Sequence, residues 1–462
     1  MTDKMDVSDG AHVSTQRGPK MVKRWLGVLT VVCSVGALGA RPAVATGAVP
    51  THRILMTYWS DNISRFAGYA MPGSLAPSGA MQTNPQMQSQ LDDINVLAYA
   101  FLQVDAAGNV YFGNPGVDLS PADLRQFCRE HAAACPHAAS ASAGSFSAFA
   151  HLTNRYHSLL KIISIGGSGS QSALDNALDH PDSFVRSATA LIHAYHIDGI
   201  DLDFEPDAFF GPAQGEQYAR VVAALRQALG NQAFISIEVP GDWETLRSID
   251  CPSYSRCRDN LVLISADAYI SLMGYDYHGP FYPGTVTGSN SNLYSDPHEP
   301  LLPGFYHVSD NQAVDYLTFR GVPDVRIILG FPAYFVSYGG VAALPGSHGL
   351  YQPFDRSRTK TYDLGGLKGV GSDRVAVRLL NSGFRPHQLL IGGTLSAVYA
   401  YSASSGEWMS YDNPASIAAK AHYVIARRLG GMMMWEIGED MPVDSPHSLL
   451  ESAHRVLIGT DP

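Results

Sequence analysis

The sequence predicts an α/β protein built on a TIM (β/α)8 barrel, with a small α+β insertion after the seventh strand. Three observations support this. Eight short apolar segments alternate with runs whose apolar residues recur at helical spacing. The chain has 462 residues, 45% of them hydrophobic, enough for one such barrel with an insertion, although two ordinary domains would also fit. Finally, acidic and aromatic residues stand at the carboxyl ends of several segments, where barrels of this kind place their active groups.

The first three strands are short apolar segments that precede the most informative stretch of the chain. They are expected at residues 52–59, 94–101 and 160–167. Between the second and third, Ser120 and Pro121 stand in the favoured N-cap and N1 order, with Asp123 completing a capping pattern. A helix should therefore begin there.

The fourth strand, at 198–205, carries a row of acidic side chains. Amphipathic runs at 184–196 and 218–229 predict helices on either side of it. Side chains two apart on a strand face the same way, so Asp201, Asp203 and Glu205 share one face. The intervening apolar residues share the other face. In a closed barrel, one of these faces is the interior.

Three neighbouring carboxyl groups do not all ionise freely, because like charges raise at least one pKa. A carboxyl group that keeps its proton near neutral pH is what a general acid requires. Glu205 is the outermost of the row and has the longest side chain. A solvated loop or a Ca²⁺ or Mg²⁺ site is the alternative, but the apolar alternation argues against both. We therefore expect no metal and no other cofactor.

Four further strands complete the predicted barrel. They are expected at residues 234–240, 269–279, 325–332 and 430–437. Polar and aromatic residues close to their carboxyl ends are candidates for the same site as Glu205. These are Met273, Tyr275, Asp276, Tyr334 and Trp435.

The interval 336–395 interrupts the strand–helix rhythm and is rich in Gly and aromatic residues. It includes a helical run at 373–380 and is expected to form the insertion, the alternative being a long loop. A last helix before the eighth strand should begin at Asn413-Pro414 and end at Gly430.

Residues 1–47 have the pattern of an export segment. Basic residues precede an apolar run at 25–40, and small residues at 43–45 offer a cleavage position. An uncleaved membrane anchor is the alternative, although the run is shorter than a typical span of about 20 residues. We expect residues 48–462 to be the mature, secreted part, without stable membrane association.

Charge and cysteine content restrict the partners and the compartment. The formal net charge is −11 and no basic run lies beyond the N-terminus, so nucleic acid is not expected to bind. Four cysteines remain outside the export segment. Three pairings are possible, and we expect the two local ones, Cys128–Cys135 and Cys251–Cys257. Four free thiols are the alternative.

The octapeptide at 198–205 resembles the D-G-x-D-x-D-x-E signature of glycoside hydrolase family 18 chitinases. Further segments resemble family motifs in the same order: S-x-G-G at 164–167, M-x-Y-D at 273–276, L-G-x-P-x-Y at 329–334 and G-G-x-M-x-W-E at 430–436. The resemblance extends from about residue 53 to about residue 457.

This resemblance implies a secreted chitinase that cleaves β-1,4-linked N-acetylglucosamine with retention of configuration, the substrate's acetamido group acting as nucleophile. Glu205 would be the general acid and base, Asp203 and Asp201 its partners, and Tyr275 a donor to the acetamido oxygen. Asp276 would grip the sugar and Trp435 would lie beneath it. The residues expected to line the cleft are Met273, Tyr58, Trp59, Phe101, Tyr334 and Phe281.

Two departures from the family pattern concern the sugar positions around the cleaved bond. Phe281 stands where many chitinases have Trp, and Phe335-Val336 follows Tyr334 where Gly-Arg is frequent. The alternatives are an endo-β-N-acetylglucosaminidase, a peptidoglycan hydrolase, and a chitin-binding lectin-like protein without turnover. The expected partner is chitin or its oligosaccharides, bound by a monomer.

Overall fold

The structure is a computed structural model of the chain, and the residues it describes form part of one compact unit. They are residues 53–60, 84–130, 144–152, 159–205, 211–251, 256–282, 286–301, 306–364 and 366–459. The export segment expected at 1–47 lies outside them. Within the described ranges, no helix combines the length and the apolar character needed to cross a membrane.

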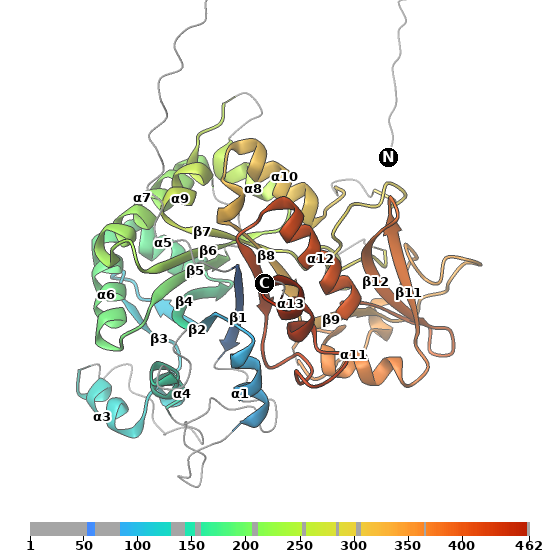
Figure 1. The fold of residues 1–462 in the computed structure, drawn as a ribbon, viewed down its shortest axis with the longest axis horizontal. Helices are drawn as coiled ribbons and strands as arrows, with labels where there is room; N and C mark the ends of the chain where they lie inside the picture. Colours follow the sequence, from blue (N-terminus) through green and yellow to red (C-terminus); the bar gives the residue numbers. More distant parts are fainter. Residues whose placement is uncertain are drawn as a thin grey trace, which may run out of the picture. The chain divides into compact units, whose positions relative to one another are not determined.

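A closed barrel of eight parallel strands forms the centre of this unit (Figure 1). Its strands are β1 (Ile54–Ser60), β2 (Val96–Val104), β4 (Leu160–Ser168), β5 (Gly199–Glu205), β6 (Phe234–Pro240), β7 (Tyr269–Met273), β8 (Ile327–Pro332) and β14 (Gly431–Trp435). The sheet runs in the order β1-β14-β8-β7-β6-β5-β4-β2-β3, and β1 also pairs with β2, which closes the ring. The short β3 (Val110–Phe112) pairs antiparallel with β2. The prediction of a TIM barrel is confirmed.

Helices alternate with the barrel strands and surround them (Figure 1). They are α1 (Pro85–Asp92), α2 (Pro115–Asp118), α3 (Pro121–Glu130), α4 (Ser145–Ala150), α5 (Gln171–Asp179), α6 (Pro181–Ala194), α7 (Pro212–Leu229), α8 (Trp243–Asp250), α9 (Asn260–Asp267), α10 (Asp310–Arg320), α12 (Pro414–Arg427) and α13 (Leu449–Leu457). At the start of α3, Ser120 Oγ donates to Asp123 and accepts from its backbone N–H, as the capping pattern predicted.

The end of α12 differs from the expectation that Gly430 terminates it. Arg428, with φ 57°, takes the left-handed position that ends the helix, and Gly430 instead donates its N–H to Ile327 as β14 begins. The start of the same helix is as predicted, because the Asn413 side chain accepts from the N–H groups of Ala415 and Ser416.

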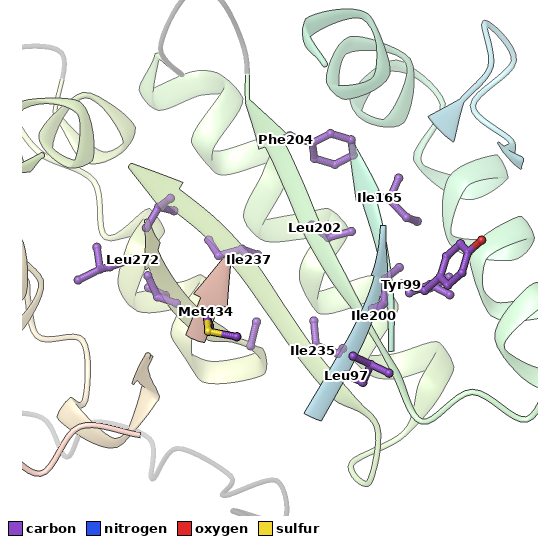
Figure 2. Packing of buried hydrophobic residues seen from close by; sticks show 14 of the residues in the cluster. Leu97, Tyr99, Ile165, Ile200, Leu202, Phe204, Ile235, Ile237, Leu272 and Met434 are labelled. Carbon is purple, nitrogen blue, oxygen red and sulfur yellow. The ribbon is translucent and has the colours of Figure 1, made fainter. Parts of the chain in front are cut away.

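Apolar residues lie on both faces of the barrel strands. Outward-facing residues pack against the helices, and Figure 2 shows ten of them labelled: Leu97, Tyr99, Ile165, Ile200, Leu202, Phe204, Ile235, Ile237, Leu272 and Met434. A second cluster fills the barrel interior: Ile54, Met56, Tyr58, Val96, Ala98, Ala100, Ile162, Phe234, Tyr269, Ile328 and Met433. Trp59 belongs to the outward set and stacks on Tyr99, so its expected place in a cleft was wrong. The strand alternation moves it to the other face.

The insertion is a second sheet of five antiparallel strands in the order β10-β9-β13-β12-β11. Its elements are β9 (Tyr334–Tyr338), β10 (Val370–Ser372), α11 (Asp373–Leu380), β11 (Arg385–Ile391), β12 (Thr394–Ser402) and β13 (Glu407–Tyr411). The sheet extends beyond the predicted interval 336–395 at both ends. Only Ala333 separates β8 from β9, so a barrel strand leads directly into the insertion.

Three of the described cysteines are disulfide-bonded. Cys251 and Cys257 are joined, which confirms one of the two expected pairings. Cys128 is also disulfide-bonded. Cys135, its expected partner, lies outside the described residues.

Candidate active site

The acidic row of β5 points into the barrel. Asp201, Asp203 and Glu205 alternate with Ile200, Leu202 and Phe204, all three of which lie in the outer core. Opposite Asp203 on β4 stands Gly166, with φ 124°. A Cβ atom there would lie 2.2 Å from the Asp203 carbonyl oxygen, so only glycine allows β4 and β5 to approach so closely.

Asp201 is the deepest member of the row and is fully buried. It accepts hydrogen bonds from three hydroxyl groups, Tyr58 at 2.9 Å, Ser164 at 2.7 Å and Ser236 at 2.6 Å. Burial raises its pKa to about 6, although these hydrogen bonds act in the opposite direction. The barrel interior therefore holds this carboxyl group in one orientation.

Asp203 occupies the middle of the row and is buried, with 4% of its surface exposed. Its Oδ1 atom has no hydrogen-bond partner among the described residues. Burial raises its pKa well above the usual range, and the charges of Glu205, Asp201 and Glu238 raise it further. The group is thus crowded by acids and keeps an oxygen free for a ligand.

Glu238, which sequence reasoning missed, is a fourth carboxyl group in this cluster. It lies on β6, is buried, and accepts a 2.7 Å hydrogen bond from Tyr58. Burial, followed by the charge of Asp201, raises its pKa well above the usual range. Its position two residues after Ser236 places it on the inward face of β6. That alternation was the signal that could have found it.

Glu205 ends the row and is half-buried. Its backbone N–H donates to Ser170 Oγ at 2.8 Å, which ties the strand end to the loop after β4. Burial raises its pKa to about 7, and the negative charge of Asp276 contributes in the same direction. Near neutral pH this carboxyl group is therefore partly protonated.

Tyr275 and Asp276 form a turn directly after β7. Asp276 has φ 61°, a left-handed conformation that Asp tolerates better than most residues. It accepts a 2.7 Å hydrogen bond from the hydroxyl of Tyr334 on β9. Burial raises the Tyr275 pKa well above its usual range, and so do the charges of Glu238, Asp203 and Glu205. Tyr275 therefore lies beside the acidic row.

Trp435, at the end of β14, is half-buried and framed by aromatic rings. Phe101 stacks on it with centroids 5.6 Å apart and an interplanar angle of 14°. Tyr58 packs below it at 5.1 Å. Trp435 and Tyr275 both pack against the inner barrel cluster and against the buried aromatic cluster of the insertion. The two residues thus lie between the barrel interior and the insertion, at the carboxyl ends of β14 and β7.

Of the remaining predicted cleft residues, two hold the carboxyl groups of the site by hydrogen bonds and two lie beside the site. Tyr58 is 1% exposed and bonded to Asp201 and Glu238, so it lies beneath the site rather than in a sugar-contacting position. Tyr334 is 7% exposed and holds Asp276. Phe281 packs on the same insertion cluster as Trp435, and the half-buried Met273 ends β7 beside the turn.

The arrangement supplies groups for acid–base and electrostatic chemistry. No group of three His, Cys, Asp or Glu side chains in the described ranges has the geometry to hold a metal ion. The site offers one half-buried acid with a pKa near neutrality, a buried acid beside it, a phenol and an indole face. Such a set can protonate a leaving group, stabilise developing positive charge and stack on a flat ring.

Comparisons with known proteins identify relatives over most of the chain. The model of the glycosyl hydrolases family 18 matches residues 58–440. Chitinase 1 of Aphanocladium album is 23% identical over 384 residues, covering 80% of this chain and 80% of that protein. Two solved structures have similar folds at 20% identity. The Group IV chitinase of Ostrinia furnacalis, in complex with allosamidin, has a TM-score of 0.66 over 89% of this chain and 100% of that one. The chitinase of Cycas revoluta, in complex with (GlcNAc)3, has a TM-score of 0.61 over 87% and 99%.

Proposed function

The chain belongs to glycosyl hydrolase family 18, and we propose that it is a chitinase that cleaves β-1,4-linked N-acetylglucosamine polymers with retention of configuration. The observation that carries this proposal is the position of Glu205. Its carboxyl group has a pKa of about 7 and stands at the rim of the barrel, at the end of a row of buried acids. The carbohydrate bound to the Cycas revoluta chitinase supports the same class of ligand.

Glu205 is assigned as the general acid. Its proton passes to the glycosidic oxygen as the bond from that oxygen to the anomeric carbon breaks. Because burial and the charge of Asp276 keep Glu205 partly protonated near neutral pH, the acid form is available without an external proton source.

The substrate's own acetamido oxygen is assigned as the nucleophile, since family 18 is an exception to the two-carboxylate scheme. It bonds to the anomeric carbon from the opposite side and forms an oxazolinium ring. Asp203, with an oxygen that lacks a hydrogen-bond partner among the described residues, accepts the acetamido N–H as positive charge develops. Tyr275 donates its hydroxyl to the acetamido oxygen. Water, deprotonated by Glu205, then opens the ring and completes retention.

Trp435 is assigned as the floor beneath the sugar at the cleaved bond. Its indole is held by the rings of Phe101 and Tyr58, which limits its movement. A flat pyranose face packs well on such a surface. Asp276 and Tyr334 are assigned to hold the sugar from the side of the insertion, and Phe281 and Met273 are assigned as further contacts of the sugar.

We also propose that residues 1–47 direct export and are then removed, so that a monomer of residues 48–462 acts outside the cell. The basic and apolar pattern of the segment supports this. The disulfide between Cys251 and Cys257 also suits an oxidising compartment.

The test is hydrolysis of chitohexaose by the wild-type chain and by Glu205→Gln, with products identified by mass spectrometry. The variant keeps the shape of the side chain but has no proton to transfer, so turnover should fall by roughly 10²–10⁴ while oligosaccharide affinity is retained. Glu451→Gln is the matched control and should keep full activity, because this half-exposed side chain of α13 pairs with Arg455 and has no part in the site. Equal turnover by Glu205→Gln would remove this residue from its assigned role.

Substrate assistance has a separate test. Fully deacetylated chitosan and cellulose lack the acetamido group, so neither should be cut under conditions in which chitohexaose is. A bacterial cell-wall digest and a glycoprotein, analysed in parallel, distinguish a chitinase from the other hydrolases of the same fold. Efficient cleavage of cellulose would contradict the proposed nucleophile.

A further inference from the structure

Lys420 is a cation without access to water behind the active site. It lies on α12, and its side chain is 1% exposed. Its ammonium group contacts the hydroxyl of Ser291, lies 3.3 Å from Asp412 Oδ2 and lies 3.9 Å from Asp310 Oδ2. A buried charge is costly unless well paired, so these partners hold the side chain in one position.

The partners of Lys420 come from distant parts of the chain. Asp310 begins α10, Asp412 follows the insertion strand β13, and Ser291 lies in the loop between β7 and α10. All three are buried. One ammonium group thus joins the barrel, the insertion and this loop at a single point.

This network reaches the turn that carries Tyr275 and Asp276. Ser291 Oγ, in contact with Lys420, donates to the carbonyl of Gly274 at 2.7 Å. The neighbouring Asn290 accepts the N–H of Asp276 on its side chain and the N–H of Tyr277 on its carbonyl. The Tyr277 hydroxyl donates to Asp310 at 2.8 Å.

Close packing leaves the turn little room for another conformation. A Cβ atom on Gly274 would lie 2.4 Å from the Gly330 carbonyl and 2.7 Å from Asp310 Oδ1. The positive φ of Asp276 is an unfavourable conformation that persists only if its surroundings enforce it. The hydrogen bonds that the N–H groups of Asp276 and Tyr277 donate to Asn290, which adjoins Ser291 in the same loop, supply that enforcement.

We propose that Lys420 is a positioning residue, whose buried contacts with Ser291, Asp310 and Asp412 fix the Gly274–Tyr277 turn and thereby the orientation of Tyr275 toward the reacting acetamido group. The catalytic part of this proposal rests on the proposed function. Lys420 does not touch the sugar and acts only through the turn.

Hydrogen exchange tests the positioning without any substrate. In Lys420→Met, which removes the ammonium group but keeps much of the side-chain volume, the amides of Asp276 and Tyr277 should exchange at least about tenfold faster than in the wild type. Lys161→Met is the matched control. Lys161 is equally buried, but it lies at the amino end of β4 and donates to the carbonyls of Ala150 and His196. This variant should therefore leave the exchange of the Asp276 and Tyr277 amides unchanged. Unchanged exchange in folded Lys420→Met would overturn the proposal.

Kinetics test the catalytic part. Lys420→Met should lower kcat by about tenfold with little change in KM, because the contact with the acetamido oxygen matters most in the transition state. Combined with Tyr275→Phe, it should cause no further loss, whereas Lys161→Met and Tyr275→Phe should have independent effects. Multiplicative losses for Lys420→Met and Tyr275→Phe would refute action through Tyr275.

Ser291→Ala provides the same test if Lys420→Met fails to fold. It removes the hydroxyl between Lys420 and Gly274 while the ammonium group remains paired with Asp412. It should reproduce the faster exchange and the loss in kcat, and wild-type values would count against the proposal. If the wild-type chain cleaves no N-acetylglucosamine polymer, the proposed function fails, and the exchange data alone decide the structural part.

Discussion

At the scale of single residues, the site depends on where carboxyl groups keep their protons. Four of them, Asp201, Asp203, Glu205 and Glu238, converge inside the barrel, and each has a raised pKa for which burial is the main cause. Only Glu205 is half-buried, which places its titration where a substrate and water reach it. A single residue thus combines exposure with a pKa near neutrality.

The pH dependence of turnover follows from Glu205. The raised pKa means that the acid form dominates below about pH 7 and is lost above it. The ratio kcat/KM, which reports the pKa of the free enzyme, should therefore fall as pH rises through about 7, approaching a tenfold loss per pH unit. The measurement is kcat/KM for chitohexaose against pH, controlled for enzyme stability at each pH. A kcat/KM that stays constant to pH 9 would contradict this assignment.

At the scale of elements, the fourth predicted strand shows what periodicity can establish. Alternation alone put Asp201, Asp203 and Glu205 on one face, and the structure has that face inside the barrel. The same alternation places Glu238 on the inward face of β6, but it does not show that this acid shares a hydrogen-bond partner with Asp201. That partner is Tyr58, 180 positions away in sequence.

The junction between the barrel and the insertion could not be located from the sequence. Because β9 begins two residues after β8 ends, no break in composition marks where the insertion starts. Its sheet is held by antiparallel pairing between distant strands, such as β9 with β13, which local sequence does not reveal. The expected boundaries were therefore too narrow.

Tyr334→Phe tests the contact that the insertion makes with the site. Loss of the 2.7 Å hydrogen bond to Asp276 should weaken substrate binding and raise KM, by about fivefold if roughly 1 kcal/mol is lost. Tyr401→Phe is the control, since its hydroxyl contacts Val341 within the insertion. The measurement is KM for chitohexaose with both variants. Equal KM values would show that the hydrogen bond has no part in binding.

At the scale of the whole molecule, buried acids make stability depend on pH. Burial raises the pKa of Asp201 and Asp440 to about 6 and of Glu205 and Asp310 to about 7. In the unfolded chain these groups titrate near pH 4. Between about pH 4 and 7 the folded state therefore binds more protons than the unfolded chain. The stability that this extra proton binding contributes is lost as pH rises through this window.

The free energy of unfolding should consequently decrease from pH 5 to pH 8. Each proton bound only by the folded state contributes a slope of about 1.4 kcal/mol per pH unit. Urea unfolding at four pH values measures it, and a double variant with Asp201→Asn and Asp310→Asn should show a shallower slope. A stability that rises over this range would refute the prediction.

The barrel closes by joining its first strand to its last. Ile54 pairs with Gly431, and β1 lies between β14 and β2. At ordinary rates of synthesis of about 5–20 residues per second, β14 leaves the ribosome roughly 20 to 75 s after β1. Until then the edges of β1 and β8 that pair with β14 have no partner strand. On the proposal that residues 1–47 direct export, a chain that enters the export pore before that moment has no completed barrel to unfold.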